Sequence, residues 1–393
     1  MTDDPPPNPA LLPAGLRDVL PPEAETEAAA VEALMTVFAA HGYQRVKPPL
    51  LEFEDSLLAG TGGAVADQTF RLMDPASHRM MALRSDTTPQ IARIATTRLA
   101  DAPRPLRLSY AGQCLRVRAT QLAPERQIAQ AGIELIGADS PEADAELVLV
   151  AAEALAALGL HRISVDLTAP PLIPALLDDA LIDGARIAEP ARSRLARALD
   201  RKDAAAVQAL AGTLAPTLIE LLLAAGAAPR ALAALRAADL PAPARAQALR
   251  LEAVVAAIAA RAPGLGLAGL TVTVDPVEFR GYRYHTGVCM TVYAPGYNQE
   301  LGRGGRYLCG DAEEPAAGLT LYPDAVLRAA PGRTPRRRVY LPLDADPERA
   351  RALRAEGFAT VAALTAADPI AEARRLGCAL VLLAEGVRPV SGE

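Results

Sequence analysis

The chain contains no tryptophan and only five phenylalanines among 393 residues, although 51% of its residues are hydrophobic. Alanine and leucine supply most of this apolar content, which favours helix-rich packing. Cysteine is also scarce, and the four cysteines lie far apart without the CxxC or His/Cys spacing of a metal site. We therefore expect reduced thiols, no metal and no other cofactor.

Long apolar runs and an excess of basic residues are missing as well. No run reaches the roughly 18 apolar residues of a membrane-spanning helix, and the acidic, proline-rich start, MTDDPPPNPA, is unlike a signal peptide. The net charge is −6, whereas a surface that follows nucleic-acid phosphates usually makes a domain basic. These absences predict a cytoplasmic protein without a membrane partner, and they argue against a nucleic-acid partner.

Length and local composition divide the chain. A chain of 393 residues is long enough for two or three domains. Residues 1–10 are rich in proline and are predicted to be a disordered tail. Residues 171–262 are dominated by alanine and leucine and predict a helical insertion between residues 11–170 and 263–330, which together form the core. After a linker, residues 336–393 alternate three strands with two helices, which predicts a small α/β unit with a parallel sheet.

The core is predicted to be α+β. Its strands follow one another with few helices between them, rather than in strict β-α-β alternation. The predicted elements are helices at 22–41, from 88 and at 141–158, an extended connector at 43–53, and strands at 79–83, 106–115, 128–137, 162–167, 270–274 and 287–293. This order indicates a mostly antiparallel sheet flanked by helices.

Two polar segments are weak signals by themselves. The run from Ser85 to Thr88 ends a predicted strand and opens a helix, so that Asp86 or Thr87 would suit a helix cap. The second segment, RGYRYHTG followed by GRGGRY, is rich in glycine but contains neither GxGxxG nor GxxxxGK. An isolated histidine such as His285 is more often structural than functional.

A third polar segment lies within the strand predicted at 128–137. Side chains alternate along a strand, so Gln130, Gly132 and Glu134 share one face while Ile133 points to the other. Buried polar groups need hydrogen-bond partners. This face is therefore expected either to meet solvent, as an exposed sheet face, or to line a pocket.

Taken in order, these segments resemble those of histidyl-tRNA synthetase and its paralogues across roughly residues 13–330. The matching segments are the opening at 13–21, class II motif 1 at 41–52, an LRPEGT-like stretch at 83–88, motif 2 and the following strand at 112–134, the histidine-specific RGLDYYTG at 280–287 and GGRYDGL from 304. The resemblance implies a class II aminoacyl-tRNA synthetase-like fold. It also implies that the small C-terminal unit is a shortened anticodon-binding domain.

The resemblance further implies a pocket for histidine. The α-ammonium group of histidine would meet Asp86 and Thr88, and its carboxylate would be held by the guanidinium fork of Arg116. Its imidazole N–H would point at Glu134. The other residues that the resemblance places in this histidine-binding pocket are Gln130, Arg280, His285 and Tyr307.

The half of the site that would bind ATP departs from the family pattern. Arg118 stands in place of a glutamate and Pro124 in place of a loop arginine, whereas His285, in place of a tyrosine, alters a wall of the histidine pocket. Ala325 occupies the position of the motif 3 arginine, and the neighbouring Asp324 would repel a triphosphate. Loss of that arginine alone should remove several kcal/mol of transition-state stabilisation, so we do not expect this chain to form histidyl-adenylate.

A synthetase-like chain with a histidine pocket but no ATP site resembles the regulatory subunit of ATP phosphoribosyltransferase. That resemblance implies a non-catalytic protein that assembles with a short catalytic subunit, supports the first step of histidine biosynthesis and responds to histidine. It also implies self-association, which we place at Tyr43–Glu52. Two alternatives remain, an active histidyl-tRNA synthetase and a synthetase-like protein that acts on another macromolecule. The missing arginine argues against the first, and the acidic charge gives tRNA binding little support.

Overall fold

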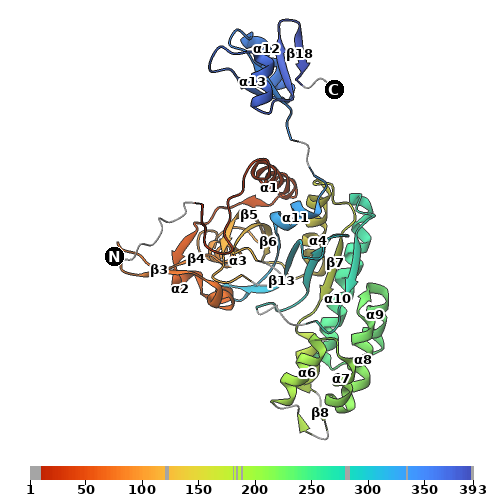
Figure 1. The fold of residues 1–393 in the computed structure, drawn as a ribbon. Coiled ribbons are helices and arrows are strands. Elements are labelled where there is room, and N and C mark those ends of the chain that lie inside the picture. Colours follow the sequence, from red (N-terminus) through yellow and green to blue (C-terminus); the bar gives the residue numbers. More distant parts are fainter. Residues whose placement is uncertain are drawn as a thin grey trace, which may run out of the picture. The chain divides into compact units, whose positions relative to one another are not determined.

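The computed structural model describes residues 10–119, 124–179, 181–182, 185–186, 189–278, 284–332 and 335–390. Contacts divide the chain into two compact units, Met1–Pro331 and Gly332–Glu393 (Figure 1). Of the predicted tail at residues 1–10, all but Ala10 lies outside the described residues. Within the described part, no helix combines the length and the apolar character that crossing a membrane requires.

The larger unit is built on a sheet to which nine strands of the described residues contribute (Figure 1). Their order across the sheet is β1 (Gln44–Arg45), β5 (Leu106–Leu115), β6 (Gln127–Ile136), β14 (Glu314–Leu321), β13 (Gly302–Cys309), β12 (Cys289–Tyr293), β7 (Ser164–Thr168), β11 (Thr271–Val274) and β10 (Gly226–Ala227). Among these described strands, only the pairs β1–β5 and β7–β11 run parallel. The predicted α+β fold with a mostly antiparallel sheet is confirmed.

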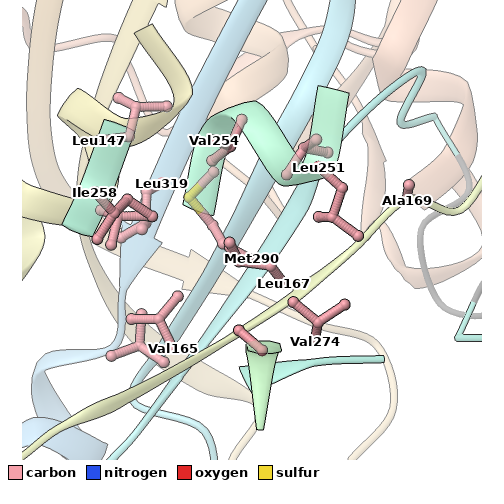
Figure 2. Packing of buried hydrophobic residues seen from close by; sticks show 14 of the residues in the cluster. Leu147, Val165, Leu167, Ala169, Leu251, Val254, Ile258, Val274, Met290 and Leu319 are labelled. Atoms are coloured by element: carbon pink, nitrogen blue, oxygen red, sulfur yellow. The ribbon is translucent and has the colours of Figure 1, made fainter. Parts of the chain in front are cut away.

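One face of this sheet is covered by helices. The helices packed there include α1 (Glu23–Ala40), α4 (Pro141–Ala156) and α10 (Ala242–Arg261). The sheet meets them with apolar side chains such as Ile133 and Leu319. Figure 2 shows Leu251, Val254 and Ile258 of α10 facing this layer. Because side chains alternate along a strand, the residues next to Ile133 point to the opposite face.

The opposite face carries a smaller apolar cluster. Helix α3 (Thr88–Thr97) packs there, with Ile91 and Ala95 against Leu108 and Tyr110 of β5. Beside α3 lies a second sheet with the order β2 (Leu51–Phe53), β4 (Met80–Leu83) and β3 (Arg71–Met73), accompanied by helix α2 (Glu54–Leu57) and the 3-10 helix η1 (Gly60–Gln68). Only part of this face is therefore filled by apolar packing.

Residues 171–262, the predicted helical insertion, hold α5 (Leu172–Asp179), β8 (Leu181–Ile182), β9 (Ala185–Arg186), α6 (Ala191–Asp200), α7 (Ala204–Leu210), η2 (Gly212–Leu214), α8 (Ala215–Ala224), β10, α9 (Ala228–Ala237) and α10, with η3 (Pro263–Leu265) after them. Buried leucines of these helices belong to the same core cluster as α4. Strand β10 also pairs with β11 in the main sheet. The segment is thus built onto the core through shared packing.

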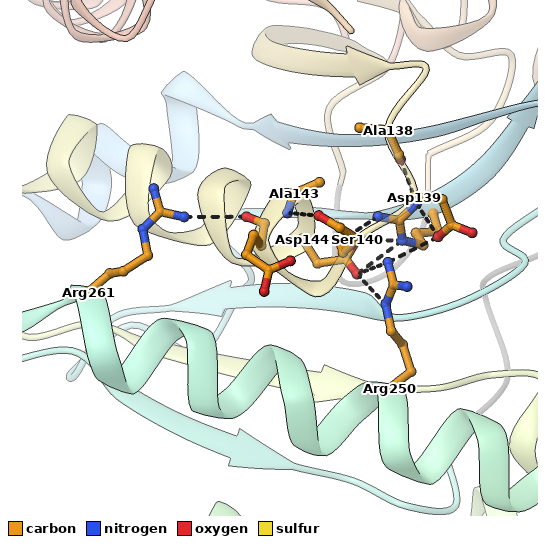
Figure 3. Close-up of polar contacts among 9 residues, drawn as sticks. Ala138, Asp139, Ser140, Ala143, Asp144, Arg250 and Arg261 are labelled. Carbon is orange, nitrogen blue, oxygen red and sulfur yellow. Dashed lines mark hydrogen bonds and ion pairs between the residues drawn. The ribbon is translucent and has the colours of Figure 1, made fainter.

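A buried ion network ties α10 to the sheet (Figure 3). Asp144 of α4 is fully buried, and its Oδ2 accepts hydrogen bonds from Nε of Arg250 at 3.2 Å and from Nε of Arg306 at 3.0 Å. Arg306 of β13 also donates to the carbonyl oxygens of Ala138 and Ser140, at 3.0 and 2.9 Å. Tyr307 is the next residue of β13 and points to the opposite face of the sheet. The ion network at Arg306 therefore also holds the backbone that positions Tyr307.

The smaller unit is an α/β sandwich of its own. Its sheet has the order β16 (Ala359–Ala362), β15 (Arg338–Leu341), β17 (Leu380–Leu383) and β18 (Gly386–Pro389), with helices α12 (Pro347–Ala355) and α13 (Pro369–Arg375). Strands β16, β15 and β17 are parallel, as predicted. Strand β18 pairs antiparallel with β17 and was not predicted.

Candidate ligand-binding site

A cavity of about 670 Å³ lies on the sheet face that α1, α4 and α10 leave open. Of the eight residues that the sequence predicts for a histidine pocket, seven line this cavity: Asp86, Thr88, Arg116, Gln130, Glu134, His285 and Tyr307. The eighth, Arg280, lies outside the described residues. Side chains that are as much as 221 positions apart in the sequence, such as Asp86 and Tyr307, therefore meet around one space.

Glu134 is a deeply buried acid in this cavity, with 1% of its surface exposed. The hydroxyl of Thr88 donates to Oε1 at 2.8 Å, and the hydroxyl of Tyr307 donates to Oε2 at 2.9 Å. Burial raises the pKa of Glu134 to about 8, although both hydrogen bonds act in the opposite direction. Two neutral donors thus hold the carboxyl group in one orientation. The exposed-face interpretation of this strand is wrong, because Gln130 is buried as well.

Glycines give the Glu134 side chain its space. Gly318 of β14 lies opposite Glu134 in the register, and a Cβ at Gly318 would overlap the carboxyl group. Gly132 of β6 lies opposite Tyr110, and a Cβ there would come within 2.6 Å of the ring carbon that bears the hydroxyl. The Tyr110 hydroxyl instead hydrogen-bonds the Thr320 hydroxyl at 2.7 Å. Small residues therefore leave a slot over the middle of the sheet.

Gln130 holds the start of α3 in place. Its Oε1 accepts hydrogen bonds from the backbone N and the hydroxyl of Thr87, at 3.1 and 2.8 Å. Its Nε2 donates to Oδ1 of Asp86 at 3.2 Å. Thr87 is the N-cap residue of α3 but makes no capping hydrogen bond with its side chain. Thr87, one of the two predicted cap residues, is therefore at the N-cap position without a side-chain cap, and Asp86 presents a carboxylate to the cavity.

Arg116 brings a positive charge to the same space. It follows β5, and its backbone N donates to the carbonyl oxygen of Arg126 at 2.7 Å. Its Nε is buried and has no hydrogen-bond partner among the residues that the structure describes. A buried guanidinium donor without a partner is costly, and a carboxylate of a bound ligand would supply the missing acceptor.

Aromatic rings close one wall. The rings of Tyr284 and His285 are stacked with centroids 4.3 Å apart, and Tyr284 meets Tyr307 edge-on at 6.2 Å. Burial lowers the pKa of His285 to about 3, and the charge of Arg303 acts in the same direction, so this imidazole is neutral at physiological pH. Tyr284 was missed as a site residue, although it stands at the first tyrosine of the family's RGLDYYTG segment.

The remainder of the cavity has mixed charge. Glu125 and Arg328 line it and form an ion pair at 2.7 Å, and Asp324 and Ala325 lie beside them. Burial raises the pKa of Asp324. Arg303 also lines the cavity and was missed by the sequence analysis. Among the described residues, no cluster of His, Cys, Asp and Glu side chains could hold a metal ion.

The comparisons with known proteins agree with one another on the family. The family model described as histidyl-tRNA synthetase matches residues 15–326. The ATP phosphoribosyltransferase regulatory subunit of Paramagnetospirillum magneticum is 54% identical, covering 97% of this chain and 98% of its own length. The ATP phosphoribosyltransferase regulatory subunit of Gluconobacter oxydans is 53% identical, and the match covers 98% of each chain.

Solved structures share the fold. A protein from Bacillus halodurans, described as an ATP phosphoribosyltransferase regulatory subunit/histidyl-tRNA synthetase, matches with a TM-score of 0.78 at 25% identity, covering 94% of this chain and 97% of its own. Histidyl-tRNA synthetase from Nostoc sp. PCC 7120 matches with a TM-score of 0.75 at 17% identity, covering 95% and 91%. The chain belongs to the family of ATP phosphoribosyltransferase regulatory subunits, whose core has the fold of histidyl-tRNA synthetase.

Proposed function

We propose that this protein is the non-catalytic regulatory subunit of an ATP phosphoribosyltransferase, that a short catalytic subunit requires it for activity, and that histidine is its ligand. The family membership supports a role in histidine biosynthesis. The observation that carries the rest is the cavity, in which a buried acid, Glu134, and an arginine, Arg116, face one space of about 670 Å³.

The cavity has complementary groups for each end of histidine. Asp86 offers a carboxylate to an α-ammonium group, and Arg116 offers buried donors to a carboxylate. Glu134 lies in the slot that Gly318 leaves open, where it can accept a hydrogen bond from an imidazole N–H. Tyr307, which donates to Glu134, closes this slot on one side.

ATP chemistry is not part of the proposal. The position of the motif 3 arginine is taken by Ala325, and the acidic groups of Asp324 and Glu125 lie close by along the cavity. Negative side chains repel a triphosphate, and no guanidinium stands at that position to stabilise its transition state. We expect no histidine-dependent exchange of pyrophosphate into ATP. Such exchange would favour an active synthetase instead.

Reconstitution tests the partnership. The turnover of a short-form ATP phosphoribosyltransferase from the same organism would be measured with and without this protein. We expect a large increase in rate on mixing, which reaches a plateau at a fixed ratio of the two chains. An unchanged rate would contradict the proposed partnership.

Histidine feedback is the second test. Inhibition requires histidine to bind an inhibited assembly more tightly than an active one. In the reconstituted complex, Glu134→Ala should weaken histidine binding and shift the inhibition curve to higher histidine concentration. Glu32 of α1 forms an exposed ion pair with Arg45 of β1, and Glu32→Ala is the control that should leave the curve in place. Unchanged histidine titration in Glu134→Ala would contradict the assignment of this cavity.

A further inference from the structure

The register of the central sheet places Arg303 in a defined row of the cavity. Arg303 lies opposite Thr320 of β14, which lies opposite Gly132 of β6, which lies opposite Tyr110 of β5. Directly opposed residues share a face, so all four lie on the same side of the sheet, and Arg303 and Thr320 line the cavity there. The neighbouring row on this face contains Glu134, with Leu108 opposite it on β5 and with glycines on β14 and β13. Arg303 is thus one row away from the imidazole slot.

On this row, the open part of the cavity begins at Thr320. Tyr110 fills the space over Gly132, where its hydroxyl bonds the Thr320 hydroxyl at 2.7 Å, whereas Thr320 and Arg303 line the cavity. Strands are about 4.8 Å apart, so Arg303 stands one strand spacing from Thr320, at the edge of the open space. Its side chain lines the cavity and forms a long ion pair with Glu300, with Nε 3.9 Å from Oε2.

Arg116 approaches the same space from the other side. It follows β5, whereas Arg303 lies on β13, and β6 and β14 run between these two strands. Tyr322, which follows β14, also lines the cavity. Burial and the charge of Glu300 raise the pKa of Tyr322, and the positive charges of both Arg303 and Arg116 oppose that rise. The cavity therefore holds two guanidinium groups within electrostatic reach of one hydroxyl.

We propose that Arg303 is a specificity-determining residue that, together with Arg116, reads the free carboxylate of the bound amino acid. The inference rests on the proposed histidine pocket and extends it. A ligand whose imidazole enters the Glu134 slot extends one row further to Thr320, the residue opposite Arg303, and its carboxylate then comes within reach of both cavity arginines. Two cations around one carboxylate select the free acid against an amide, an ester or an alcohol of the same shape.

The remaining cavity arginine provides a matched control. Arg328 lines the outer part of the cavity, where its guanidinium is 2.7 Å from the carboxylate of Glu125. Removing it changes the charge of the cavity by the same amount as removing Arg303. Only an arginine that contacts the ligand carboxylate should distinguish a free acid from its amide.

The test is calorimetric titration of the full chain with L-histidine and with L-histidinamide, which differ only in the carboxylate. Wild type should prefer histidine. Arg303→Met should weaken histidine binding by about 10- to 100-fold, the range for a charge-assisted hydrogen bond, and change histidinamide binding by less than about 3-fold. Arg303→Lys should lie in between for histidine, and Arg328→Met should change the affinities for both ligands by the same factor.

Each outcome decides the proposal. Equal losses for histidine and histidinamide in Arg303→Met would mean a structural role and would overturn it, as would no loss for either ligand. If Arg303→Met does not fold, Arg303→Lys carries the same comparison, and a loss confined to histidine is again required. A wild-type chain that binds no histidine would overturn the proposed ligand as well, whereas wild-type binding with an unaffected Arg303→Met overturns the role of Arg303 alone.

Discussion

At the scale of single residues, Glu134 makes folding stability depend on pH in the absence of ligand. Burial raises its pKa from 4.5 to about 8. Between these values the folded chain holds a proton that the unfolded chain has lost, so the free energy of unfolding falls as pH rises. The contribution is fully present below pH 4.5 and is lost as pH rises through about 8. One such group changes the slope of the free energy of unfolding against pH by up to about 1.4 kcal/mol per pH unit.

Glu134→Gln removes this titration while keeping the size of the side chain. We expect its free energy of unfolding, measured by urea denaturation from pH 5 to pH 8.5, to fall less steeply with pH than that of the wild type. Absolute stability also changes, because Tyr307 and Thr88 each donate to a carboxyl oxygen and an amide has one acceptor oxygen. The slope is therefore the informative quantity, and parallel curves would contradict a raised pKa.

Gly318 is a second residue on which the cavity depends. Gly318→Ala would place a Cβ where the Glu134 carboxyl group now lies. Forcing an extra carbon into a packed site costs about 1–3 kcal/mol of stability and displaces the acid from its slot. We expect histidine affinity in calorimetry to fall at least about tenfold, the equivalent of 1.4 kcal/mol.

The control for this change is Gly264→Ala. A Cβ at Gly264 meets no atom within 4 Å, so both stability and histidine binding should stay close to those of the wild type. If Gly318→Ala bound histidine as the wild type does, Glu134 would have room to move aside and the slot would not be rigid.

At the scale of elements, periodicity predicted those parts of the fold that have apolar alternation. The strand predicted at 106–115 is β5 with the same bounds, and the strand at 128–137 is β6 shifted by one residue. The connector at 43–53 separates into β1 and β2, because Pro48 and Pro49 have no N–H for a strand ladder.

Other elements carry too weak a local signal. Strands β13 and β14 were not predicted, since GRGGRYLC and EPAAGLTL contain glycines and a proline that are depleted in strands. Only cross-strand pairing in the middle of the sheet specifies them. Arg303 lies on β13 and was missed for the same reason, because its place beside the cavity follows from the register of three strands.

The site residues also divide into those that a local sequence pattern predicts and those that it does not. Gln130 and Glu134 could be placed on one face from the alternation in β6 alone. The meeting of Glu134 with Thr88 and Tyr307 joins residues 46 and 173 positions apart, and no local pattern contains it. The resemblance to a known family brought these residues together before the structure did. That they bind histidine stays a prediction.

The ion network between α10 and β13 leads to a prediction at this scale (Figure 3). Arg250→Met removes one of the two guanidinium groups that compensate the fully buried Asp144. Hydrogen bonds to charged groups contribute about 1.5–3 kcal/mol, and we expect a loss of that size in the free energy of unfolding. Since Arg306 precedes Tyr307, histidine affinity should fall as well.

Arg236→Met is the matched control. Arg236 is an arginine of the neighbouring helix α9 and forms an exposed ion pair with Glu252 of α10, at 2.6 Å. Exposed pairs contribute about 0–1 kcal/mol, so stability and histidine binding should change little. If the two variants lost equal stability in urea denaturation, the Asp144 network would have no special role.

At the scale of the whole molecule, the predicted self-association region at Tyr43–Glu52 is only partly available to a second chain. Tyr43 is 2% exposed and its hydroxyl donates to Glu146, while Glu52 is paired with Arg93. Leu50, in contrast, is 53% exposed. The apolar surface available for association therefore begins at Leu50 and does not include the start of the predicted region.

A second set of exposed apolar side chains lies on the neighbouring strands. Met73 of β3 is 60% exposed and lies opposite Met80 of β4, which is 44% exposed, and β4 pairs with β2 immediately after Leu50. Large apolar side chains exposed side by side mark association surfaces more often than single ones do.

We expect the chain to be a dimer in sedimentation analysis and Met73→Glu to shift it toward the monomer, because a charge on this surface would be buried without a partner. Leu364→Glu, at a leucine that is 94% exposed in the smaller unit, is the control and should leave the mass unchanged. A dimer that survives Met73→Glu, or one that Leu364→Glu disrupts, would place the interface elsewhere.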